Sequence, residues 1–380
     1  MDFDHTDEQR ALRDAVRGLL GTAYGTIQGR RDATAKEPGY DESMWSRLAA
    51  MGVLGLPFAE EAGGMGAGPV EVGVVAEEIG RVLAPEPFVE AVVLCGGLLA
   101  RAGADVSGIA DGTLLPAYVG GPGVTARRDG ERWVLDGGAS PVLNGARADL
   151  LVVVADVGGT PALFTTAGGE RTPFSTYDGG RAARVAFDAT AAGPLGDPAA
   201  DATGLIAYAR ARAQVAYAHE ALGAMERALE ITRDYLRDRR QFGKPLSAFQ
   251  NLSFRASDMY VSLELARSTV LWASMVLAER DETGGDGAGG DGAGGDRTQS
   301  GAAEGIEAAS RAKLRVAESG RHIGQEAVQL HGGIGMTMEY QVGHYAMRLT
   351  AIEHLLGDRR HHLSRLAAAV GDHRAVNPLQ

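Results

Sequence analysis

A long helical pattern in the C-terminal half of the chain ends in the stretch RRQFGKPL, residues 239–246, and Phe249-Gln250 follows shortly after it. The Gly-Lys-Pro sequence within this stretch stops the helix, which predicts a tight turn and then a new helix. A helix end and a turn expose backbone groups, and an arginine such as Arg239 offers a planar fork for a phosphate. An exposed arginine near a turn is usually only solvated, so this stretch alone is weak evidence of a binding site.

A second segment, about 90 residues further on, has the sequence QLHGGIGMT at residues 329–337. Here a predicted helix ends in glycines, which let a ligand approach the backbone closely. A Gly-Gly pair after a helix is also a common C-terminal cap, so this segment is weak evidence on its own as well. The two segments, in this order, stand out from the rest of the C-terminal half.

Most of the C-terminal half is helical from Leu205 onward and predicts a four-helix-bundle domain at 198–380. One strict apolar seam steps by four and three residues through Met259, Leu263, Ala266, Val270, Ala273 and Leu277. Another apolar face consists of Leu222, Met225, Leu229 and Leu236. Seams of this kind pack helix against helix far more often than they line a ligand site.

A Gly/Asp repeat interrupts this helical pattern at 281–300. Such a repeat has no apolar surface to bury, which favours a flexible loop within the bundle domain. The repeat is weakly similar to a calcium-binding Gly/Asp repeat. The nonapeptide pattern with its apolar position is absent, however, so we favour the flexible loop and expect no metal site.

The N-terminal part predicts a helical domain at 1–110. Thr6-Asp7-Glu8-Gln9 has the pattern of a capping box, with a hydroxyl at the N-cap and Gln three residues on. One helical face is then formed by Leu12, Ala15, Val16 and Leu19. The glycine-rich stretch at 61–66 indicates a loop between helices. No strand precedes it and no Lys-Ser/Thr follows, which argues against a phosphate-binding P-loop.

The pattern changes near residue 111, where short β-branched or aromatic runs bounded by Gly and Asp begin. Such runs are typical of strands. They are Trp133-Val134-Leu135, Leu150–Ala155, Ala162-Leu163-Phe164 and Arg184–Phe187. We therefore expect a small β-barrel or β-sandwich domain at 111–197, and an α+β fold class with a helical domain on each side of it in the chain.

Composition sets limits on the function. The 380 residues carry a net charge of −12 and no basic stripe, which argues against a nucleic-acid partner. The first residues are acidic and no run of about 18 apolar residues occurs, so we expect neither a signal peptide nor a membrane span. The single cysteine, Cys95, lies in an apolar run and is interpreted as a buried small hydrophobe. A chain without an internal disulfide suits a cytoplasmic location.

Together the two C-terminal segments resemble the acyl-CoA dehydrogenase family, and the resemblance covers nearly the whole chain. It includes MGVLGLP at Met51–Pro57, the acidic Gly-Gly loop after it, and the α–β–α order of domains. In particular, the chain resembles the subunits of heteromeric α2β2 bacterial members. The resemblance implies FAD as cofactor, an acyl-CoA substrate, and an electron-transfer flavoprotein or similar electron acceptor.

In that family FAD lies between two subunits, and the two segments serve the FAD whose isoalloxazine ring sits in the neighbouring subunit. The resemblance implies that Arg239 contacts the pyrophosphate and that Phe242 packs on the cofactor. It adds Gln241, Leu246 and Gln250 to the same cofactor-binding set. The second segment would line the adenosine and pyrophosphate with Gln329, Leu330, His331, Gly332 and Gly333.

The chain departs from the family where a subunit serves its own flavin ring and acyl chain. The usual catalytic glutamate is replaced by Leu356, and the earlier position that some relatives use is Ala213, beside Gln214. Neither leucine nor alanine can take the α-proton of a thioester. Pro141-Val142-Leu143 stands where the family has Trp-Ile-Thr, and Pro116–Gly121 stands in the region of another flavin-binding loop. No catalytic residue is therefore expected in this chain.

The losses lie among the groups that a subunit offers to its own flavin ring and acyl chain. The groups that a subunit offers across the interface to the FAD of its neighbour are kept. We therefore expect a subunit of an FAD-dependent acyl-CoA dehydrogenase that acts in lipid metabolism (β-oxidation). It would contribute the ADP half of the FAD site to a catalytic partner subunit in an α2β2 heterotetramer, which carries out α,β-dehydrogenation of an acyl-CoA thioester. Fold-level analogy with relatives that have paired, unequal subunits suggests a bulky, steroid-type acyl group.

Two alternatives stay open from the sequence. The first is a self-sufficient homotetrameric dehydrogenase with a non-standard base, for which Asp358 is the best candidate and Glu353 the next. The second is a non-enzymatic assembly protein of the same fold that holds no flavin.

Overall fold

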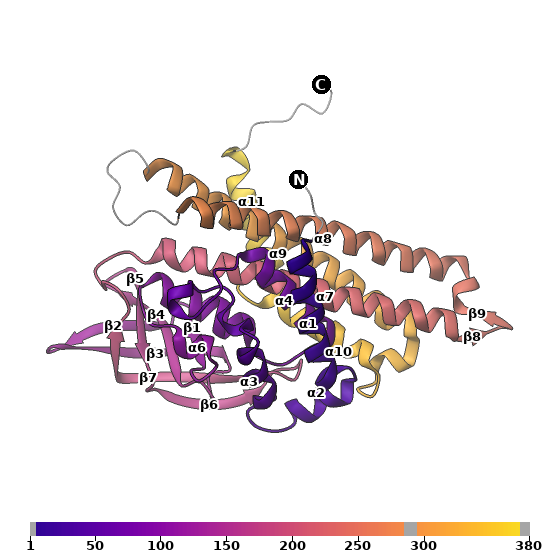
Figure 1. The fold of residues 1–380 in the computed structure, drawn as a ribbon, viewed down its shortest axis with the longest axis horizontal. Helices are drawn as coiled ribbons and strands as arrows, with labels where there is room; N and C mark the ends of the chain where they lie inside the picture. Colours follow the sequence, from indigo (N-terminus) through magenta and orange to yellow (C-terminus); the bar gives the residue numbers. More distant parts are fainter. Residues whose placement is uncertain (1–4, 285–294, 373–380) are drawn as a thin grey trace. The chain divides into compact units, whose positions relative to one another are not determined.

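The computed structural model describes residues 5–284 and 295–372 (Figure 1). Its elements run in the predicted order of helices, strands and helices, which confirms the α+β fold class. The chain divides into two compact units, Met1–Ala224 and Met225–Gln380, and the boundary falls within helix α7 (Thr203–Asp238).

Short helices make up the chain before the sheet. They are α1 (Asp7–Tyr24), α2 (Ile27–Thr34), α3 (Glu42–Ala50), η1 (Val53–Gly55), η2 (Glu60–Ala62), α4 (Pro69–Val82), η3 (Phe88–Gly96), α5 (Gly97–Arg101) and α6 (Ser107–Ala110). The predicted capping box is confirmed at α1: the Thr6 hydroxyl accepts from the Gln9 N–H at 3.2 Å, and Gln9 Oε1 accepts from the Thr6 N–H at 3.0 Å.

The predicted apolar face of α1 is only partly right. Val16 is buried, but Ala15 is exposed, and the buried face continues through Leu20 and Tyr24. Residues four apart lie nearly above one another on a helix, so Val16, Leu20 and Tyr24 form one stripe, which leaves Ala15 outside it.

Helix α4 and the first part of α7 cross with their backbones in contact. A Cβ atom on Gly80 would lie 1.9 Å from the carbonyl oxygen of Glu220. A Cβ atom on Gly223 would lie 1.8 Å from the carbonyl oxygen of Glu77. No side chain fits at such distances, so this crossing depends on glycine at both positions.

The strands of the first unit close into a small barrel (Figure 1). Around the barrel, β4 pairs with β2, followed by β3, β7 and β5, which pairs again with β4; β1 and β6 add to β4 and β7. The strands are β1 (Pro116–Val119), β2 (Val124–Asp129), β3 (Arg132–Leu143), β4 (Leu150–Val157), β5 (Thr160–Thr166), β6 (Glu170–Ser175) and β7 (Arg181–Pro194). Its core includes the fully buried Leu135, Val153 and Phe164. The sheet is thus a barrel and not an open sandwich.

The second unit is helical, with a small hairpin after α7. Its elements are β8 (Arg240–Gln241), β9 (Lys244–Pro245), η4 (Leu246–Ala248), α8 (Gln250–Gly284), α9 (Gly295–His331), η5 (Gly332–Met336), α10 (Gln341–His354), α11 (Arg359–Ala369) and η6 (Val370–Asp372). Helices α8 and α9 lie side by side, and α10 and α11 also pack on α9. The predicted seam of α8 is confirmed, because each of its six residues is at most 3% exposed.

Both ends of the loop expected at 281–300 are helical, so the prediction is wrong there. Helix α8 continues to Gly284, and α9 already begins at Gly295. Adding a residue to an existing helix needs little free energy compared with starting one, so both helices extend into the polar repeat. The expected flexible loop at 285–294 lies outside the described residues.

Two further expectations concern Cys95 and membrane spans. Cys95 in η3 is fully buried, and burial raises the pKa of its thiol well above its usual value, as expected for a small hydrophobe.

Among the described residues, α8 is long and apolar enough for a membrane span by composition, with a mean hydropathy of 1.3 over its most apolar stretch. Core helices meet the same criterion, and α8 packs its seam against α9.

A buried carboxyl, Glu86, lies among the N-terminal helices and is 4% exposed. The Tyr24 hydroxyl donates to its Oε1, and the Asp41 N–H donates to the same atom at 3.4 Å. Its Oε2 has no hydrogen-bond partner in the part of the chain that the structure describes. Burial raises the pKa of Glu86 to about 7, although the hydrogen bond from Tyr24 acts in the opposite direction.

The helix crossing predicts the effect of adding a methyl group. We expect Gly223→Ala to lower the free energy of unfolding by about 1–3 kcal/mol or more, because the methyl group collides with the α4 backbone. The control is Gly18→Ala in α1, where a Cβ meets nothing within 4 Å, so the better helix former should stabilise slightly. Denaturant titration measures both changes. Equal stability of the two variants would contradict the backbone contact.

The buried carboxyl predicts a pH dependence of stability. Since the pKa of Glu86 is raised from 4.5 to about 7, the folded chain binds this proton more tightly than the unfolded chain. The resulting stabilisation is present at acidic pH and is lost as the pH rises towards 7 and beyond. We expect the free energy of unfolding to fall from about pH 5 to about pH 8, and to fall less in Glu86→Gln, which retains an acceptor for Tyr24. The same pH profile in both proteins would refute this assignment.

Candidate functional site

An aromatic stack brings the two predicted segments together within the second unit. Tyr235 on α7 stacks on His331 at the end of α9, with ring centroids 4.3 Å apart and 29° between the planes. The Tyr235 hydroxyl donates to the backbone oxygen of His331 at 3.3 Å. Tyr340 packs against the His331 ring at 5.1 Å. Because Tyr235 lies one turn before Arg239, the stack places the end of α7 beside the end of α9.

Phe242 is presented to solvent by a strained two-residue turn. Strands β8 and β9 pair Gln241 with Lys244, which leaves Phe242 and Gly243 as the turn, with φ of 51° and 80°. Hairpin turns of this kind need the left-handed conformation at both central residues. For a non-glycine residue this conformation costs roughly 1–2 kcal/mol. The Phe242 side chain is nevertheless 91% exposed, so nothing within the chain offsets this cost by burial.

The rest of the first segment is arranged around this hairpin. The Leu246 N–H donates to the Arg239 carbonyl at 2.8 Å, which fixes the backbone where α7 ends and leaves the Arg239 side chain exposed. Phe249 contacts Phe242 edge-on, with ring centroids 6.2 Å apart. Gln250 begins α8 and is exposed, as is Gln241 on β8.

The second segment contains a buried acceptor without a partner. His331 Nδ1 lies 2.7 Å from the carbonyl oxygen of Ala327, so Nδ1 carries the proton and donates it. Burial lowers the pKa of His331, which favours the neutral ring. Nε2 of this ring is then an acceptor, and it has no partner among the residues that the structure describes. A ligand that offers a hydroxyl or an amino group would satisfy it.

The glycines after His331 leave the backbone accessible. Gly332 has a φ of 66°, which suits the end of a helix. A Cβ atom on Gly332 or Gly333 would meet nothing within 4 Å, so no neighbouring side chain covers this turn. Gln329 is exposed, whereas Leu330 is 6% exposed and belongs to the core of the bundle.

These groups fit the ADP half of a flavin. An exposed guanidinium suits a pyrophosphate, an exposed aromatic ring suits a planar cofactor, and an open glycine turn allows close approach. The orphaned Nε2 of His331 adds an acceptor for a ribose hydroxyl or an adenine amino group. The individual roles of the predicted residues stay predictions. Sequence reasoning missed Tyr235 and Tyr340, although the spacing of Tyr235 one helical turn before Arg239 could have suggested the former.

The two expected base positions carry no carboxylate, and the best candidate, Asp358, serves as a helix cap. Leu356 follows α10 in the left-handed conformation, with a φ of 57°. Asp358 is the N-cap of α11 and accepts the His361 N–H at 2.8 Å, and this hydrogen bond lowers the pKa of the Asp358 carboxyl. In the first unit, Ala213 is fully buried and Gln214 is 6% exposed.

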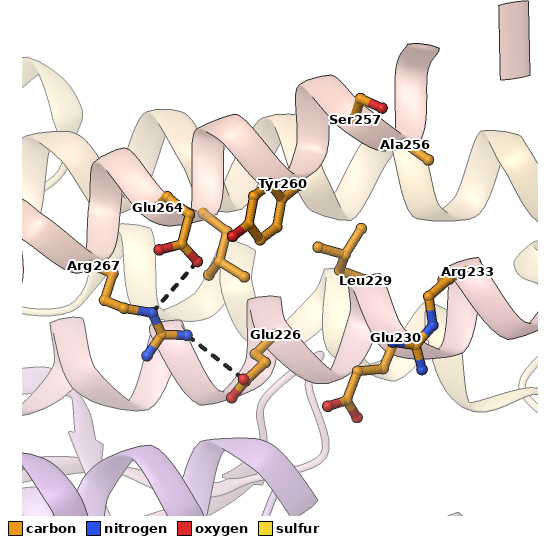
Figure 2. A pocket seen from close by; sticks show the side chains of 10 residues that line it. Glu226, Leu229, Glu230, Arg233, Ala256, Ser257, Tyr260, Glu264 and Arg267 are labelled. Atoms are coloured by element: carbon orange, nitrogen blue, oxygen red, sulfur yellow. Dashed lines mark ion pairs between the residues drawn. The ribbon is translucent and has the colours of Figure 1, made fainter. Parts of the chain in front are cut away.

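A separate groove of about 410 Å³ opens between α7 and α8, and Figure 2 shows the side chains that line it. Arg267 forms ion pairs with Glu226 at 3.6 Å and with Glu264 at 3.7 Å. Leu229 and Leu263 supply apolar lining. None of the predicted cofactor-binding residues lines this groove.

The order of domains and the exposed groups at the two helix ends, which form the predicted half of an FAD site (the half-site), fit a chain of the flavin-dependent acyl-CoA dehydrogenase type. A family model described as the acyl-CoA dehydrogenase N-terminal domain matches residues 6–106, and one described as the C-terminal domain matches residues 204–371. The chain is 31% identical to the acyl-CoA dehydrogenase IpdE2 of Mycobacterium tuberculosis over 370 residues, which cover 96% of this chain and 98% of that protein. This chain belongs to the acyl-CoA dehydrogenase family.

Two solved structures are similar over almost the full length. One is a steroid ACAD, Tcur3481-Tcur3483, with 30% identity, a TM-score of 0.82, and coverage of 96% of this chain and 98% of that chain. The other is the ChsE4-ChsE5 complex from Mycobacterium tuberculosis, which shares the fold with 24% identity, a TM-score of 0.86, and coverage of 99% and 100%. The predicted family is thus confirmed, and FAD is the cofactor of that family.

The half-site predicts a selective loss of flavin affinity. In the FAD-loaded protein, Arg239→Ala should weaken FAD binding by about 1.5–3 kcal/mol, because the predicted charge-assisted contact to phosphate would be lost. The matched control is Arg237→Ala, an exposed arginine two residues earlier on α7. Flavin content after dialysis, read from absorbance, compares the two. Equal flavin retention would remove Arg239 from the site.

Proposed function

We propose that this chain is the non-catalytic subunit of an α2β2 acyl-CoA dehydrogenase and that it completes the FAD site of a catalytic partner. In this proposal the two helix ends hold the ADP half of FAD, through Arg239 and Phe242 in the first segment and His331 to Gly333 in the second. When bound, FAD would supply the hydride acceptor for α,β-dehydrogenation, and the partner would supply the base. The proposal places the complex in the cytoplasm, with an electron-transfer flavoprotein or similar protein as electron acceptor.

The observation that carries this proposal is the state of Asp358, the better of the two candidate bases in this chain. A general base works best when its pKa lies near the operating pH. Asp358 caps α11 through the His361 N–H, and the lowered pKa makes its carboxylate a weaker proton acceptor. This argues against the self-sufficient homotetramer.

The alternative of a flavin-free assembly protein is less well supported. A chain with no ligand at this end would gain stability by placing glycine at Phe242 and by pairing or removing the buried Nε2 of His331. The structure instead keeps an exposed aromatic ring in a strained turn and, at the end of α9, a buried acceptor without a partner among the described residues.

For the substrate, we propose a bulky, steroid-type acyl-CoA. The support is the similarity to a solved structure that is described as a steroid ACAD, with which this chain shares 30% identity over almost its full length. The ChsE4-ChsE5 neighbour is itself a complex of two named subunits, which is consistent with a heteromer.

Activity measurements of the lone chain and of the complex test the proposal. The lone chain with added FAD should show little acyl-CoA dehydrogenation, because a missing base typically costs about 10²–10⁴-fold. Activity should appear when the chain is co-expressed with its partner and should survive Asp358→Asn, since asparagine also caps a helix well. The wild-type complex is the control. Turnover by the lone chain that Asp358→Asn abolishes would make Asp358 the base and overturn the heteromer.

A further inference from the structure

Helix α8 has three distinct faces. Its apolar seam packs towards α9, and the face with Tyr260, Glu264 and Arg267 lines the groove beside α7 (Figure 2). The third face points outward, and we call it the outer stripe. It consists of Phe254, Asp258, Val261, Leu265, Ser268 and Trp272.

The outer stripe exposes apolar groups at a regular spacing. Phe254, Val261 and Leu265 are 58%, 53% and 52% exposed. The six positions alternate in steps of four and three residues, which is the spacing that keeps one line of side chains facing a second helix along its length. Exposed apolar surface with such a period indicates an interface between helices, whereas scattered exposed apolar residues need no explanation.

The stripe is also symmetric about position 263. In an antiparallel pair of α8 helices centred there, Phe254 faces Trp272 and Val261 faces Leu265. An aromatic group then meets an aromatic group, and an aliphatic group meets an aliphatic one. Trp272 is held for this contact, because the Arg311 guanidinium lies over its ring at 5.5 Å. A two-fold interface requires such self-complementarity.

The polar positions of the stripe select the antiparallel orientation. Asp258 would face Ser268, which is neutral and whose hydroxyl donates to the Glu264 carbonyl of its own helix at 2.9 Å. A parallel pair in register would instead place Asp258 against the same residue of the second copy. Like charges at such positions destabilise a helix pair.

We propose that the outer stripe of α8 is the contact between two copies of this chain, which pair in antiparallel orientation about a two-fold axis near position 263. This contact would join the two identical subunits of the assembly and leave the β8–β9 hairpin and the glycine turn after α9 for the catalytic partner. The inference stands apart from the proposed flavin role, because it depends only on the residues of α8.

Cysteine cross-linking tests the register. The native Cys95 is fully buried, so introduced thiols are the accessible ones. In the full chain carrying Asp258→Cys and Ser268→Cys, oxidation should give a covalent dimer on a non-reducing gel. Each single variant should run as a monomer on this gel. In an antiparallel pair, the two copies of the same residue lie about 15 Å apart along the helix axis, too far for a disulfide. Positions 258 and 268 of one helix are also about 15 Å apart, which prevents a disulfide within one chain.

Two results of the cross-linking experiment would overturn the proposal. A dimer from Asp258→Cys alone would mean parallel pairing, and no dimer from any variant would mean that the stripe does not join two copies. Light scattering adds an independent measurement: Val261→Asp should lower the molar mass of the lone chain. The control is Leu363→Asp on α11, at a residue that is 45% exposed, and it should leave the mass unchanged. A Val261→Asp chain that keeps its mass but no longer co-purifies with the partner would assign the stripe to the partner instead.

Discussion

The stack of Tyr235 on His331 is the contact on which the candidate site depends. It joins the end of α7 to the end of α9. The Tyr235 hydroxyl also donates a hydrogen bond to the backbone oxygen of His331, which lies 96 positions further along the chain. Without it, the exposed arginine after α7 and the glycine turn after α9 would be two unrelated helix ends. With it, both ends present their exposed groups at one end of the bundle, where one extended ligand can contact both.

The site contrasts with the bundle that holds it. Along α8 the buried seam is continuous, and this packing stabilises the second unit whether or not a ligand is bound. At the helix ends, Phe242 occupies a strained conformation with its ring in solvent, and His331 leaves a buried nitrogen unsatisfied. Each of these features costs stability, and neither helps the chain to fold. Features of this kind are typical of functional sites, where local rules of folding are broken.

Sequence reasoning succeeded where the cause is local or periodic. The capping box of α1 depends on residues three apart, and the seam of α8 depends on a repeated spacing, so both could be predicted. Strand β1 has only four residues, and β6 is largely exposed without alternation, so neither gives a periodic signal. The stack of Tyr235 on His331 joins distant residues and has no local signature. The residues of the candidate site were found by family resemblance, and their individual roles still require measurement.

The position that the family resemblance assigns to a base and the predicted cofactor-binding residues lie in different surroundings. Ala213 is fully buried, and a carboxylate there would have to lose its hydration. Of the predicted cofactor-binding residues, Phe242 is exposed and in a strained conformation, which lowers the stability of the chain. Binding to the folded chain alone restores stability by mass action. A ligand that contacts Phe242 and satisfies Nε2 of His331 would therefore stabilise the folded chain.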